Sequence, residues 1–159
     1  MEGGKEMKHL KLAIELVPKT SWYSNLRNKV SSENWDFIRE RTYDSYGNKC
    51  AICDAKNTRL ECHEIWEYDD QNHIQALKGF IALCQMCHHV KHIGLARILA
   101  DEGKLDYDAV IEHFIRVNGC DKKDFLNHRE KAFEIWEKRS KYKWTIDLGQ
   151  FLNIIEGEK

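Results

Sequence analysis

The pattern of apolar and polar positions predicts two strands and a helix in the middle of this chain. Residues 60–68 and 79–83 are short segments rich in aliphatic and aromatic side chains, which is typical of strands. Residues 69–73, Asp-Asp-Gln-Asn-His, separate them and have turn composition. A helix is predicted from near His88 to about residue 100. The predicted order is therefore strand, turn, strand and helix.

Three further helices are predicted on either side of this centre. The first covers about 33–46, because Ser31-Ser32 suits a helix start and Gly47 suits its end. The other two cover about 107–117 and 122–140, where apolar side chains recur at helical spacing. We interpret these apolar stripes as core positions.

These elements predict an α+β fold with helices at both ends. Residues 1–32 are expected to form an N-terminal extension, 33–100 a central domain with its preceding helix, and 101–159 a C-terminal helical extension. A chain of 159 residues is long enough for one domain with one modest core.

Charge and composition narrow the classes of function. The net charge of −1 and the pI near 6.7 give no overall basic field, so binding to nucleic acid would depend on local patches. No apolar run is long enough to span a membrane, and the first 30 residues lack the apolar core of a signal peptide. We therefore expect a cytoplasmic protein without a membrane partner. In a reducing compartment, Cys-x-x-Cys pairs indicate metal sites rather than disulfides.

Two Cys-x-x-Cys pairs are the strongest chemical signal in the chain. Cys50 and Cys53 form the first pair and Cys84 and Cys87 the second, with 30 residues between the pairs. Four thiolates at this spacing suit one closed tetrahedral site, so we expect a structural Zn²⁺ ion there.

Three histidines near these pairs predict a second, open metal site. His88 and His92 are four residues apart and share a face of the predicted helix, and His63 on the preceding strand could supply a third nitrogen. Three protein ligands leave positions open for water and a substrate oxygen, as a catalytic site requires. Nitrogen ligands suit Zn²⁺, Ni²⁺, Mn²⁺ or Co²⁺ better than Mg²⁺, which prefers oxygen.

Together these motifs resemble the HNH endonucleases, whose fold is named ββα-metal. The matching segments are Cys50-Ala-Ile-Cys53, Leu60-Glu-Cys-His-Glu-Ile65 and Leu83-Cys-Gln-Met-Cys-His-His-Val-Lys-His92. The longer segment from Glu61 to Asp69 is similar to a bacterial and phage subgroup of such proteins. The resemblance covers about residues 50–92 and implies a small ββα-metal core held by the four-cysteine zinc.

The resemblance also implies metal-dependent hydrolysis of DNA phosphodiester bonds. His63, His88 and His92 would hold the catalytic ion, and Glu64 stands where the family has a histidine as general base. The family's asparagine, which orients that base, would fall near Gly79 and is absent. Because the usual pKa of glutamate is roughly 4.3 against about 6.5 for histidine, Glu64 is the weaker base unless burial raises its pKa.

Several alternatives stay open at this point. Glu64 could instead bind the ion, with a water or another residue as base. The main alternative to an endonuclease is a catalytically degenerate HNH-fold zinc module that binds nucleic acid or a protein partner. A small metallohydrolase with another substrate and a purely structural zinc domain are further alternatives. DNA is the expected partner, with Arg59, Lys91 and Arg97 as candidate phosphate contacts, and a homodimer or another protein is the alternative partner.

Overall fold

The computed structural model describes residues 9–21 and 30–156, which form an α+β fold with two compact units. Residues 9–21 contain no helix or strand, and residues 1–8 and 22–29 of the predicted N-terminal extension lie outside the described residues. No helix in the described part of the chain is both long and apolar enough to cross a membrane. The two units are described separately below.

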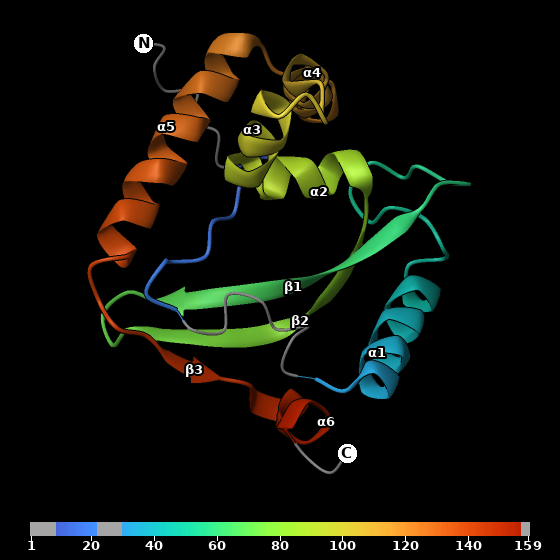
Figure 1. Ribbon diagram of the computed structural model, residues 1–159, viewed down its shortest axis with the longest axis vertical. Coiled ribbons are helices and arrows are strands. Elements are labelled where there is room, and N and C mark those ends of the chain that lie inside the picture. The colour runs from blue at the N-terminus through green and yellow to red at the C-terminus, as the bar shows by residue number, and fades with distance from the viewer. Residues whose placement is uncertain (1–8, 22–29, 157–159) are drawn as a thin grey trace. The chain divides into compact units, whose positions relative to one another are not determined.

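The first unit is built on a three-stranded sheet in which β2 lies between β1 and β3 (Figure 1). It consists of the described parts of residues 17–84 and 136–159. Strands β1 (Leu60–Asp69) and β2 (Ile74–Cys84) form an antiparallel hairpin, and β3 (Thr145–Asp147) runs parallel to β2. The sheet therefore joins the middle of the sequence to a segment near its end.

The hairpin turn lies where the sequence predicts it. Both the Gln71 and the Asn72 backbone N–H groups donate to Asp69 Oδ1 at 3.0 Å, a local bond that favours a turn over a continued strand. The second strand is longer than the predicted segment 79–83, because it begins directly after the turn at Ile74. The polar side chains near its start interrupt the apolar run, so the sequence pattern does not mark this part of the strand.

One face of the sheet carries helix α1 (Ser32–Ser45) and the core of this unit. The predicted N-terminus of α1 is confirmed, since the Ser31 hydroxyl accepts from the Asn34 N–H at 3.1 Å. The 3-10 helix η3 (Gly149–Phe151) and helix α6 (Leu152–Glu156) complete the unit. Its buried cluster consists of Val30, Trp35, Ile38, Leu77, Leu148 and Ile155.

The second unit is helical and consists of the described part of residues 1–16 with residues 85–135. Its core includes Phe114 and Phe125, whose rings meet edge to face with centroids 5.2 Å apart. The predicted helices of the C-terminal extension are confirmed. The helices of the unit are α2 (Gln85–Lys91), α3 (Ile93–Asp101), α4 (Tyr107–Asn118) and most of α5 (Lys122–Arg139).

The single helix predicted from near His88 to about residue 100 is wrong, because the structure has two helices there. Helix α2 ends at Lys91, and His92 has φ −107° and ψ 55°, outside the helical region, before α3 begins at Ile93. Gly94 lies in the first turn of α3, and glycine disfavours a continuous helix by roughly 1 kcal/mol relative to alanine. The break therefore falls at the weakest part of the predicted helix.

Strand β3 has no counterpart among the predicted elements. It contains only three residues, which is too short for an alternating pattern to be recognised. It is positioned by pairing rather than by its own sequence: the Thr145 N–H donates to the His73 carbonyl at 2.9 Å, beside the hairpin turn.

Candidate metal centre

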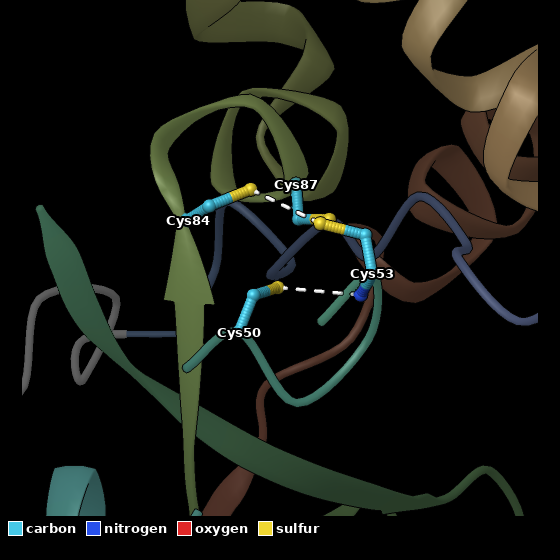
Figure 2. A group of neighbouring side chains, drawn as sticks. All are labelled: Cys50, Cys53, Cys84 and Cys87. Atoms are coloured by element: carbon cyan, nitrogen blue, oxygen red, sulfur yellow. Dashed lines mark hydrogen bonds between the residues drawn. The ribbon is translucent and has the colours of Figure 1, made fainter. Parts of the chain in front are cut away.

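The first Cys-x-x-Cys pair lies in a tight turn just before β1. The Asp54 N–H donates to the Cys50 carbonyl and the Cys50 N–H to the Ala55 carbonyl, each at 3.0 Å. The Cys53 N–H points to Cys50 Sγ at 3.5 Å (Figure 2). Asp54 has a positive φ of 64°, a conformation that aspartate tolerates better than most residues. This turn holds the two sulfurs on the same side of the loop.

A backbone bond attaches this turn to the sheet. The Ala51 N–H donates to the Ala82 carbonyl of β2 at 2.9 Å. Ala82 lies two residues before Cys84, the last residue of β2. The first pair is therefore held beside the beginning of the second, and Cys53 Sγ lies 3.6 Å from Cys84 Sγ (Figure 2).

All four predicted cysteines form one group. The sulfurs of Cys50, Cys53, Cys84 and Cys87 all lie within 4.8 Å of one another. Their free thiols exclude disulfides, whose sulfurs would be about 2.0 Å apart. A tetrahedral zinc with bonds of about 2.3 Å would separate its sulfurs by about 3.8 Å, close to the 3.6 Å between Cys53 Sγ and Cys84 Sγ. These four cysteines can hold a zinc ion.

Burial adds a charge argument to this geometry. Cys50 and Cys87 are fully buried and Cys84 is 6 % exposed. Buried thiolates are costly without a compensating cation, and a zinc ion held by these four cysteines would supply two positive charges. The arrangement is compatible with the closed centre of a zinc ribbon.

Cys87 has a neighbour that the sequence did not indicate. His113 of α4 is buried, and its Nε2 lies 3.2 Å from Cys87 Sγ. Its Nδ1 lies 3.2 Å from Nη2 of Arg116. The two residues are 26 positions apart, so no short motif links them.

The three predicted histidines also come together. Ligand nitrogens of His63, His88 and His92 all lie within 4.8 Å of one another. His63 is buried on β1, whereas the other two are half-buried and their ring centroids are 4.7 Å apart. The break after α2 does not separate them, because the His92 N–H still donates to the His88 carbonyl at 3.1 Å. The group has the ligand number of an open site.

Glu64 does not belong to this group. Successive side chains of a strand point to opposite faces, so Glu64 shares the face of Cys62 and Trp66, two residues of the α1 side, and His63 takes the other face. Burial raises the pKa of the Glu64 carboxyl, while the charge of His63 acts in the opposite direction. A raised pKa makes the carboxylate a stronger base than an ordinary glutamate, but the position on the strand does not direct this carboxyl to the histidines.

Gly79 occupies a position with space for a side chain. It pairs with Ile65 beside a β-bulge, and a Cβ built there would make only an ordinary contact of 3.9 Å with Ile65 Cδ1. A side chain at this position would take the face of His63, two pairs away along the hairpin. The glycine is therefore not imposed by a close approach of the backbone.

The three basic residues predicted to contact phosphate differ in their surroundings. Lys91 is 7 % exposed, and its Nζ lies 3.1 Å from Glu15 Oε2, so its charge is already engaged in the helical unit. We therefore do not retain Lys91 as a phosphate contact. Arg59 is exposed and 3.7 Å from a Glu61 oxygen, and Arg97 is exposed and 3.4 Å from Asp101. Exposed pairs of this kind are weak, so both arginines stay candidates.

Comparisons of the chain with known proteins found no match. No family model matches the chain, and no curated protein or solved structure matches it either. The four-cysteine group is therefore identified by its geometry and chemistry alone.

Proposed function

We propose that this protein is an HNH-type, metal-dependent endonuclease that hydrolyses DNA phosphodiester bonds. The observation that supports this proposal most is the group of His63, His88 and His92, whose ligand nitrogens converge and which shares no member with the four-cysteine group. A zinc domain with a structural role alone needs no second set of converging ligands.

In this proposal the two groups have different tasks. The cysteines hold a structural zinc, and the histidines hold a second divalent ion, with Zn²⁺, Ni²⁺, Mn²⁺ and Co²⁺ preferred over Mg²⁺. An ion bound by three histidines would polarise the scissile phosphate and make water a stronger nucleophile near neutral pH. The exposed Arg59 and Arg97 would contact flanking phosphates.

Glu64 is not the proton acceptor in this proposal. The resemblance to HNH endonucleases puts it at the position of the general base, but it takes the face of the sheet opposite His63. A general base must come within hydrogen-bond reach of the proton that it removes, directly or through one water. Bulk water would then accept the proton of the attacking water.

Nicking of supercoiled plasmid tests the proposal. Zinc-loaded protein should convert the plasmid to its relaxed form when Mn²⁺, Ni²⁺ or Co²⁺ is added, and a chelator should stop the reaction. His92→Ala, prepared in the same way, should be inactive, whereas His9→Ala, which changes an exposed histidine outside the group, should be active. Equal nicking by both variants would reveal a contaminating nuclease and refute the proposal.

The second candidate is a catalytically degenerate module that kept the fold and binds nucleic acid or a protein partner. The glycine at position 79 and the orientation of Glu64 favour it, because both differ from the arrangement expected of an HNH endonuclease. Retention of labelled DNA without cleavage by any of these metals would support this module over the endonuclease. Neither binding nor cleavage would favour a purely structural zinc domain or a different substrate.

A further inference from the structure

His113 lies against a metal-ligand candidate but is not itself a member of the ligand group. Within the helical unit α2 packs on α4, and this packing brings His113 Nε2 to 3.2 Å from Cys87 Sγ. The group of atoms that all lie within 4.8 Å of one another contains the four cysteines and no histidine. His113 is therefore placed to contact a ligand rather than the ion.

The neighbours of His113 determine which ring nitrogen carries the proton. Arg116 Nη2 lies 3.2 Å from His113 Nδ1, and a guanidinium can only donate hydrogen bonds. Nδ1 must therefore be the acceptor and carry no proton. A neutral imidazole has its single proton on the other nitrogen, so Nε2–H points at the Cys87 sulfur.

We propose that His113 is a positioning residue of the zinc centre, whose Nε2–H donates to the Cys87 thiolate while Arg116 fixes the tautomer. Such a bond orients the lone pairs of the Cys87 sulfur and withdraws negative charge from that sulfur. The thiolate is thereby held in the direction that a zinc bond needs, and is less available to alkylating or oxidising reagents. The inference depends on the four-cysteine zinc but not on nuclease activity.

The unchanged chain allows a direct test. With ¹¹³Cd in place of zinc, a proton on Nε2 that bonds to a metal-bound sulfur should show scalar coupling to the cadmium in an NMR spectrum. We expect this coupling at the His113 side chain, together with nitrogen shifts that identify the Nε2–H tautomer. An Nδ1–H tautomer without coupling to cadmium would overturn the proposal.

Substitutions supply the second test, with zinc affinity measured by competition with a chromophoric chelator. His113→Leu removes the donor from a buried site, and loss of such an outer partner typically weakens metal affinity roughly 10–100-fold. His113→Gln places an amide N–H at a similar reach and should recover most of that loss. Arg116→Met leaves the His113 ring in place but removes the donor to Nδ1. The His113 nitrogen shifts should then show a mixture of the two tautomers.

Rescue by glutamine separates hydrogen bonding from packing. If His113→Leu and His113→Gln lose zinc equally, the ring only fills space and the proposal is wrong. If His113→Leu keeps the zinc affinity of the parent, it is wrong as well. Should His113→Leu fail to fold, the cadmium coupling in the unchanged chain still decides the matter.

Discussion

The four cysteines and the three histidines differ in burial and in the number of ligands, although Cys87 and His88 are consecutive residues of α2. Three of the four cysteines are buried, and four sulfurs are enough to complete the tetrahedral coordination of a zinc ion. In the histidine group only His63 is buried, and three nitrogens leave positions open. The difference teaches that one short segment can contribute side chains to a closed group and to an open group, and variants can test the two groups separately.

The largest effect is expected from loss of a cysteine ligand. Structural zinc contributes roughly 10–16 kcal/mol of apparent binding free energy in small domains, whereas a typical domain is stable by only about 5–15 kcal/mol. Cys84→Ser should therefore lose its zinc and unfold, as measured by metal analysis and circular dichroism. Cys120→Ser, which changes a cysteine outside the group, is the matched control and should keep both. A folded, zinc-free Cys84→Ser protein would show that the cysteines do not support the fold.

Removal of a histidine ligand should stop the proposed reaction without unfolding the protein. An ion stabilises transition-state charge by several kcal/mol, and each 1.36 kcal/mol is tenfold in rate, so nicking by His92→Ala should fall by roughly 10²-fold or more. The variant should still contain one zinc and melt near the parent temperature, because the two groups share no ligand. Loss of zinc from His92→Ala would show that the groups are not independent.

A substitution of Glu64 distinguishes two roles for this residue. The strand geometry places it outside the reaction, whereas the resemblance to HNH endonucleases makes it the general base. Because its side chain takes the face opposite His63, Glu64→Gln should keep a nicking rate near that of the parent. Loss of a positioned general base would instead lower the rate by roughly 10²–10⁴-fold. Single-turnover rates at saturating protein measure this difference. A drop in that range, with unchanged stability, would restore Glu64 as the base.

The smallest effect concerns a histidine with a structural task outside the ion group. His128 Nε2 accepts from the Ile14 N–H at 2.9 Å, which a protonated ring cannot do. Burial, and then the charge of Lys91, lowers the pKa of His128 from its usual 6.5. Protonation therefore favours the unfolded state, and the stability from this group is complete above about pH 6.5 and is lost as the pH falls further.

His128→Gln isolates this contribution. The amide oxygen can accept the same bond from Ile14 but does not titrate near neutral pH. Between about pH 7.5 and 5.5, the free energy of unfolding of the zinc-loaded parent should fall more than that of the variant. Chemical denaturation at several pH values measures the two curves, and parallel curves would contradict the structural role.

Local sequence signals predicted most elements of this fold. Ser31 and Gly47 mark the ends of α1, and the cluster of polar residues after β1 marks the hairpin turn. Each of these features depends on hydrogen bonds between residues at most four positions apart, so a short stretch of sequence is enough to predict it. The Cys-x-x-Cys spacing likewise predicted which four sulfurs converge.

The features that the sequence missed depend on contacts between distant segments. Strand β3 is formed by pairing with the hairpin, where the Thr145 N–H donates to the His73 carbonyl. A strand of three residues is too short for its sequence to predict that pairing. No sequence signal links His113 to Cys87, and the packing of α4 on α2 brings the two side chains together. The break at His92 lies in the backbone angles of a single residue, which a periodic pattern of apolar positions does not reveal.

Cobalt titration of the metal-free 159-residue chain tests the separation of two ion sites most directly. We predict that the first equivalent gives intense sulfur-to-cobalt charge transfer in the near ultraviolet, from ions bound to the four cysteines. The second should add only weak visible bands, and His92→Ala should lose these bands while keeping the charge transfer. Saturation of the parent by one equivalent, or a second step that His92→Ala leaves unchanged, would contradict the account.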